Sequence, residues 1–104
     1  MCQLFVSADP LLYQSRARSL RLHGMVTSIR LENQFWVILE RMAQEERTTT
    51  TRLITALHDE LLARRGEVEN FASFLRVCCV RSEERRLTVA AARQDAASLV
   101  EYRI

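Results

Sequence analysis

The spacing of the apolar residues changes within the ten residues 27–36, TSIRLENQFW. Up to Leu31, apolar and polar residues alternate, which is typical of a strand with one buried face. From Phe35 onward the apolar residues recur every three or four positions, which predicts a helix. The chain is therefore expected to change from strand to helix at Glu32 and Asn33. A strand this short is not stable alone and needs a second strand beside it.

Two upstream segments are candidates for further strands. Residues 2–7, CQLFVS, are predicted to form a strand that ends at Asp9 and Pro10. Residues 19–22 and 26–31 also alternate, and the His23-Gly24 pair between them predicts a tight turn. In such a hairpin one buried face would carry Leu20, Leu22, Ile29 and Leu31. The basic segment before Gly24 is either this second strand or a flexible arm.

Two helices joined by a short turn are predicted next. The first runs from about residue 33 to 46, with Asn33 or Glu32 at its N-terminus. Four consecutive threonines follow, and β-branched threonines favour a turn over a helix interior. The second helix is predicted from about residue 50 to 64, with Thr49 as N-cap and Gly66 as C-cap.

The remainder of the chain is expected to add a third helix and a tail. Residues 66–81 contain an apolar series that favours a short helix packed over the first two, with a strand as the alternative. Residues 82–104 have helix propensity but a weak apolar stripe, so they are expected to form a loosely attached helix or a partly disordered tail. The expected divisions are 1–24, 25–65, 66–81 and 82–104.

Length and composition indicate one small globular domain. A chain of 104 residues with 48% hydrophobic residues has a modest core, so a homo-oligomer is expected. No apolar run reaches the ~18 residues of a membrane span, and the N-terminus lacks the features of a secretion signal, so a cytoplasmic protein is expected. The adjacent Cys78 and Cys79 are expected to be buried, reduced thiols.

The excess of positive charge lies in the first third of the chain, where acidic residues are scarce. Residues 1–31 carry a net charge of +3, and residues 32–104 carry −1. The acid-free segment between Pro10 and Leu31 contains four arginines, Arg16, Arg18, Arg21 and Arg30. This distribution is expected of a surface that faces a polyanion.

Enzyme chemistry finds little support in the sequence. His23 and His58 have no partner at metal-ligand spacing, and two glycines cannot build a glycine-rich phosphate loop. Removal of Met1 would expose Cys2 as an N-terminal nucleophile, but the chain is too short for the sandwich that such amidohydrolases need. No enzyme activity, cofactor or metal is therefore expected.

The order strand, helix, turn, helix over residues 27–62 resembles the ribbon-helix-helix family of DNA-binding proteins, the Arc/MetJ type. The basic segment before the strand, the ENQFW helix start and the NFASFLRV segment resemble a small alphaproteobacterial-type subgroup, which extends the likeness to residues 1–81. The resemblance implies a mostly helical α+β fold. It also implies an intertwined homodimer in which one strand of each chain forms an intermolecular antiparallel ribbon.

The resemblance implies a transcriptional regulator, such as a repressor, that places its ribbon in the major groove of double-stranded DNA. Outward residues of the ribbon would read bases: Val26, Ser28 and Arg30, although the family more often has a polar residue at the position of Val26. The start of the second helix would bind phosphate through Thr49, Thr50, Thr51, Arg47 and Arg52.

The basic segment before the ribbon offers an auxiliary arm, Arg16, Arg18 and Arg21, which as a flexible arm would enter the minor groove. The alternative function is a protein-interaction module of the same dimeric fold, an adaptor or an antitoxin-like protein. Such a module would bind its protein partner through residues 66–104.

Overall fold

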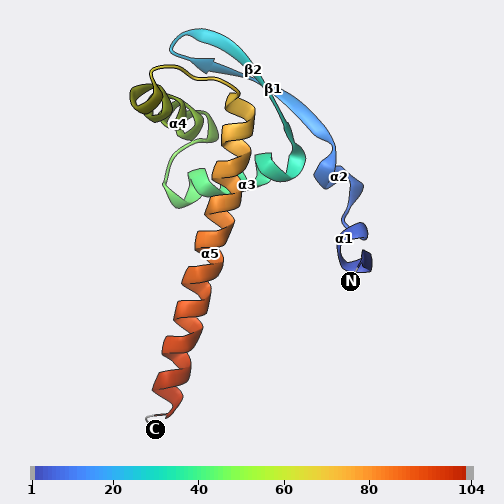
Figure 1. The fold of residues 1–104 in the computed structure, drawn as a ribbon, viewed down its shortest axis with the longest axis vertical. Coiled ribbons are helices and arrows are strands. Elements are labelled where there is room, and N and C mark those ends of the chain that lie inside the picture. The colour runs from blue at the N-terminus through green and yellow to red at the C-terminus, as the bar shows by residue number, and fades with distance from the viewer. Residues whose placement is uncertain (1, 103–104) are drawn as a thin grey trace.

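A computed structural model describes residues 2–102 of the chain. Two short helices, a β-hairpin and three longer helices follow one another: α1 (Cys2–Val6), α2 (Pro10–Tyr13), β1 (Ser15–Leu22), β2 (Met25–Glu32), α3 (Asn33–Glu45), α4 (Thr50–Arg65) and α5 (Phe71–Tyr102). The hairpin lies at one end of the molecule, and the three longer helices lie on one side of it (Figure 1).

The predicted hairpin at His23-Gly24 is confirmed, and its strands are longer than expected. β1 and β2 are antiparallel, and the pairing runs from Ser15 opposite Glu32 to Leu22 opposite Met25. His23 and Gly24 have φ angles of 50° and 80°. Positive φ at both central residues is the geometry of a type I′ turn, whose twist matches that of the strands it joins.

Within the chain, β1 pairs with one edge of β2. The pairing with a second copy that the resemblance implies stays a prediction. The segment before Gly24 is therefore a strand and not a flexible arm. The strand predicted for residues 2–7 is wrong, because Cys2–Val6 forms the helix α1.

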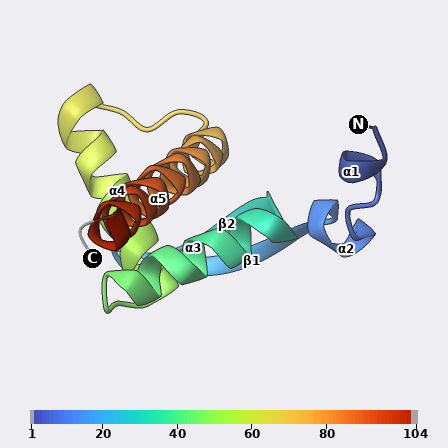
Figure 2. The same cartoon turned by 90° about the horizontal axis from the view of Figure 1, so that it is seen from below.

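The inward face of the hairpin and the three longer helices enclose the core. Leu20, Leu22, Ile29 and Leu31 are 0–7% exposed, as the alternating pattern predicted. The helices bring residues of equally low exposure against them: Trp36 and Leu39 from α3, Ile54 from α4, and Leu75 and Cys79 from α5. Figure 2 shows α3 running along the hairpin. Full burial of one such leucine contributes about 1.5–3 kcal/mol.

The predicted boundaries of α3 and α4 are confirmed to within one residue. Thr49 is the N-cap of α4, and Gly66 ends that helix with a φ of 77°. Glu32 precedes α3 as its N-cap but forms no side-chain cap. Asn33 does not cap the helix, because its Nδ2 instead donates to the carbonyl of Leu11 at 2.8 Å.

The helix does not break between residues 66–81 and 82–104, since α5 is one helix of 32 residues. Its first turns carry Leu75 and Cys79 into the core, which also excludes a strand there. Glu83 is held by an ion pair with Arg41 of α3. Beyond Glu83 the helix projects away from the body (Figure 1), and residues 84–97 are exposed.

The N-terminal segment contacts the rest of the chain through α2, where the carbonyl of Leu11 accepts a hydrogen bond from Asn33. Asp9 accepts a hydrogen bond from the N–H of Leu11, and Pro10 stands at the first position of α2, so both favour a helix start. Leu4, Phe5 and Val6 of α1 are 70–80% exposed. None of the helices in residues 2–102 is long and apolar enough to cross a membrane.

Candidate nucleic-acid interface

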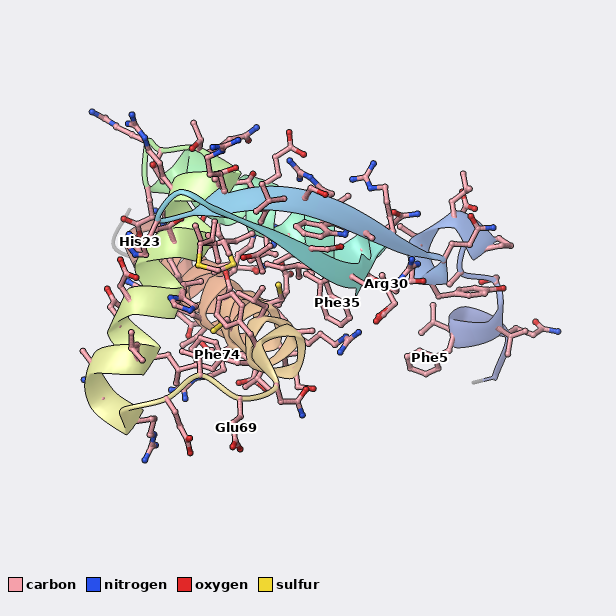
Figure 3. The ribbon with its side chains drawn as sticks, turned by 90° about the horizontal axis from the view of Figure 1, so that it is seen from above. Phe5, His23, Arg30, Phe35, Glu69 and Phe74 are labelled. Carbon is pink, nitrogen blue, oxygen red and sulfur yellow. The ribbon has the colours of Figure 1, made fainter. Side chains whose placement is uncertain are left out.

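The outward face of β2 carries the three side chains expected to read bases. Val26, Ser28 and Arg30 are all exposed, because they alternate with the buried Ile29 and Leu31 and the half-buried Thr27. Nη1 of Arg30 donates to Oγ of Ser15 on the neighbouring strand at 3.2 Å. This contact holds the guanidinium over the same face as Ser28 and leaves its other donors free. Figure 3 looks onto the hairpin from that side.

The three arginines of the expected arm lie on different faces of β1. Arg21 is opposite Val26, so it belongs to the outward face. Arg16 and Arg18 are opposite Leu31 and Ile29 and therefore belong to the face toward the helices.

Arg18 packs on the aromatic residue at the start of α3. Its guanidinium carbon lies 4.9 Å from the centre of the Trp36 ring, within the range of a cation–π contact. Nε1 of Trp36 donates to the backbone carbonyl of Arg16 at 2.9 Å. Both contacts attach β1 to α3, so this half of the expected arm has a structural role.

The turn between α3 and α4 is built around Arg47. This residue has a φ of 57°, in the left-handed region that favours glycine. The N–H of Arg47 donates to the carbonyl of Gln44 at 3.0 Å, and the N–H of Thr48 donates to that of Ala43 at 2.9 Å. Those two bonds define a Schellman motif, in which glycine is usual at the position of Arg47. A charged, exposed residue thus stands where the backbone is strained.

The threonines after that turn start α4 as predicted. Oγ1 of Thr49 accepts a hydrogen bond from the N–H of Arg52 at 3.2 Å. The N–H groups of Thr50 and Thr51 belong to the first turn, where a helix has no carbonyl of its own to accept them. Arg47 and Arg52 are exposed beside them. This helix start combines free donors, a positive helix dipole and two guanidinium groups, a set that suits a phosphate.

A hydrogen bond between side chains joins the tip of the hairpin to α4, and the sequence did not predict it. Nε2 of His23 lies 2.6 Å from Oδ1 of Asp59, and Nδ1 of His58 lies 3.4 Å from the same atom. The His23 contact lowers the pKa of Asp59, with a smaller contribution from His58. His58 packs edge-on against Phe71 of α5, with the ring centres 5.4 Å apart. Thirty-six residues separate Asp59 from His23, so no local pattern indicates the pair.

An ion pair fixes the other end of the hairpin. Glu32, the last residue of β2, accepts hydrogen bonds from Nη2 and Nε of Arg76 on α5, each at 2.8 Å. The hydrogen bond from Arg76 lowers the pKa of Glu32. The two contacts hold the hairpin at both ends against helices, so its outward face is presented by a fixed scaffold. Among residues 2–102 no three His, Cys, Asp or Glu side chains gather closely enough to hold a metal ion.

The hairpin, the two following helices and the first turns of α5 are the elements of a ribbon-helix-helix protein. The chain belongs to this family, since the family's sequence model for the ribbon-helix-helix domain matches residues 15–82. The match begins at the first residue of β1, so it includes the whole hairpin. Proteins of the family are typically DNA-binding transcription regulators and generally not enzymes.

A solved structure has a closely similar fold. The chain is similar to an uncharacterized protein from Bordetella pertussis Tohama I, with a TM-score of 0.81 and 49% sequence identity. The likeness covers 85% of this chain and 70% of that one. No curated protein matches the chain.

Proposed function

We propose that the protein binds double-stranded DNA sequence-specifically and regulates transcription, as a repressor does, with the hairpin in the major groove. One observation carries the proposal: the outward face of β2 presents Ser28 and Arg30 to solvent on a firmly anchored ribbon. A major groove about 12 Å wide admits a two-stranded ribbon. Membership of the ribbon-helix-helix family supports the same function.

Each outward residue of β2 has a role that its chemistry suits. Arg30 donates two hydrogen bonds to O6 and N7 of guanine, and the hydroxyl of Ser28 donates or accepts at the next position. Val26 contacts the methyl group of thymine. The free N–H groups of Thr50 and Thr51 bind a backbone phosphate, while Thr49 caps the N–H of Arg52.

Arg47 and Arg52 flank this phosphate site and add charge. Charge-assisted contacts of this kind position the protein on DNA without reading sequence, and they make its affinity depend on salt. We propose that two copies form a homodimer, which works at the nucleoid in the cytoplasm and contacts two half-sites.

Selection from a pool of randomised duplexes across a salt series tests this function. The wild type is expected to enrich a defined site. The Arg30→Ala variant is expected to keep a similar salt slope and to lose the preference for guanine at one position of that site, because it loses a base contact and keeps the phosphate contacts.

Arg16→Ala is the matched control, since Arg16 is exposed on the other face of the hairpin. It is expected to enrich the wild-type site. Full specificity in the Arg30→Ala variant would refute the assignment of Arg30, and absence of binding by the wild type at physiological salt would refute the DNA-binding function.

Exposed apolar side chains along α5 favour one alternative, a protein-interaction module of the adaptor or antitoxin-like kind. Val77, Val80 and Leu87 of that helix are 50–69% exposed. A variant without residues 82–104 would lose its protein partner in a pull-down if the alternative holds. The DNA-binding function predicts no such loss, and the truncated variant would still enrich the wild-type DNA site.

A further inference from the structure

The face expected to read DNA includes residues of two strands, whereas the sequence indicated residues of β2 alone. The three outward residues of β2 were assigned from its own alternation, but β1 lies beside it in a fixed register. Residues directly opposite each other in a sheet point to the same face. The three outward pairs nearest the turn are therefore Arg21 with Val26, Ser19 with Ser28, and Ala17 with Arg30. By the same alternation the last pair, Ser15 with Glu32, belongs to this face, and Arg76 of α5 binds the Glu32 carboxylate.

The turn determines how close these pairs are. In a two-residue hairpin, the residues that flank the turn, here Leu22 and Met25, form a hydrogen-bonded pair. Counting from there, the three outward pairs are non-hydrogen-bonded pairs, in which the Cα atoms are only about 4.5 Å apart. Ser19 and Ser28 thus place two hydroxyl groups side by side at the centre of the face.

The two arginines stand at opposite ends and on different strands. Arg21 is opposite Val26, and Val26 precedes Arg30 by four residues, so the two arginines are separated by about 13 Å along the ribbon. That span corresponds to roughly four base pairs, at about 3.4 Å per base pair. Both residues are exposed, and neither forms an ion pair in the described part of the chain.

We infer that β1 is a second DNA-reading strand, in which Arg21 contacts a guanine and Ser19 shares the central position with Ser28. The inference rests on the proposed function and extends it. The hairpin of one chain, two strands about 4.8 Å apart, is by itself a ribbon that fits one major groove. The hairpin has no two-fold axis, so the sequence it reads is not palindromic. A dimer would then read two copies of this asymmetric element as an inverted repeat.

Comparison of Arg21→Ala with Arg30→Ala in the same selection tests the inference. Arg21→Ala is expected to lose roughly tenfold to a hundredfold of the preference for guanine at one position of each half-site. That position should lie about four base pairs from the one affected by Arg30→Ala, as the ribbon geometry requires. Arg16→Ala, on the same strand and the opposite face, should change neither position.

Arg21→Lys separates a base contact from a phosphate contact. Lysine keeps the charge but lacks the two-pronged donor geometry, so a base contact predicts that this variant keeps the salt slope and loses the guanine preference. If Arg21→Ala weakens binding to all sequences equally and Arg21→Lys restores it, Arg21 contacts phosphate and the inference is overturned.

The remaining outcomes are also distinguishable. If the wild type and Arg21→Ala enrich the same site with the same preferences while Arg30→Ala does not, the inference fails and the proposed function stands. If the wild type enriches no site, both fail. A circular dichroism spectrum like that of the wild type for each variant ensures that a loss reflects contacts with DNA rather than unfolding.

Discussion

The two faces of the hairpin differ sharply although the same sixteen strand residues form both. The inward face packs Leu20, Leu22, Ile29 and Leu31 on the helices, with exposures of 0–7%. The outward face leaves Arg21, Ser28 and Arg30 exposed, with one hydrogen bond from Arg30 to Ser15.

Such a division separates positions that stabilise the fold from positions available for binding. Burial makes inward positions costly to change, whereas outward positions contribute little to folding, which suits the DNA-reading role that we propose for them. The period of two keeps the two roles on alternate residues, so neighbours in the sequence should respond to substitution in opposite ways.

The largest expected effect is at the inward face. Leu31→Ala should lower the free energy of unfolding by about 2–5 kcal/mol, because the Leu31 side chain is 0% exposed and its removal leaves a cavity in the core. Ser28→Ala on the outward face of the same strand should change it by no more than about 0.5 kcal/mol. Urea denaturation of the two variants measures the difference, and equal losses would break the distinction between the faces.

The second prediction concerns the core on which the inward face packs. Burial raises the pKa of Cys79 to about 12, from an ordinary value of 9.0. Between pH 9 and 12 the unfolded chain loses this proton and the folded chain keeps it, so stability is unaffected below pH 9 and falls above it. The loss from this thiol is about 1.4 kcal/mol per pH unit.

Unfolding of the reduced protein at pH 8 and pH 10 measures that slope. Cys79→Ala is the control, since it removes the thiol and should show a flatter decline with pH. An identical decline in both proteins would mean that Cys79 ionises in the folded protein as readily as in the unfolded chain.

A smaller effect is expected at the strained turn of the phosphate site. Arg47→Gly should raise the free energy of unfolding by about 0.5–1 kcal/mol, because glycine relieves the left-handed strain at some cost in unfolded-state entropy. Loss of the charge should reduce the salt slope of DNA binding by about 1. Arg47→Ala removes the charge but keeps the strain, so it should weaken DNA binding without the gain in stability.

The smallest effects should be opposite for two arginines of the ribbon. Arg18→Ala loses the cation–π contact with Trp36, so it should lower stability by about 0.5–1 kcal/mol and leave base preference unchanged. Arg30→Ala should leave stability within about 0.5 kcal/mol and remove the preference for guanine at one position of the site. Denaturation and duplex selection on both variants check this, and a loss of both properties in either variant would argue against separate roles for the faces.

Much of the fold could be predicted from spacing alone. Alternation identified the four inward residues, the His23-Gly24 pair located the turn, and the threonines with Gly66 located both ends of α4. Each of these signals is local, since it depends on backbone preferences and on a residue's immediate neighbours.

The features that the sequence did not predict correctly depend on contacts between residues that are distant in the sequence. The first half of β1 is polar, so its sequence does not indicate a buried face. Arg18 nevertheless faces inward, where its guanidinium packs on the Trp36 ring, a contact that sequence spacing does not reveal. The apolar run CQLFVS is too short to distinguish strand from helix. The end of α5 has a weak apolar stripe, and residues 84–97 are correspondingly exposed.

In the candidate site too, features set by local spacing were predictable and features set by distant contacts were not. The outward positions of β2 were predictable, and their exposure is observed, because their own strand defines the alternation. Arg21 lies on the outward face, whereas Arg16 and Arg18 lie on the inward one. This difference follows from the pairing of β1 with β2, and the sequence had left open whether β1 is a strand. The strain at Arg47 was also not predictable, since glycine is the residue that normally indicates a left-handed helix end.

The projection of α5 will govern how the protein moves through solution. The Cα radius of gyration is 17.4 Å, and the molecule extends over 58 × 35 × 23 Å, whereas a compact chain of about this length has a radius near 13 Å. An elongated particle experiences more friction than a sphere of equal mass. A gel-filtration column calibrated with compact proteins will therefore assign a single copy too large a mass. The number of chains in the particle has to be determined by light scattering or sedimentation equilibrium, which do not depend on shape.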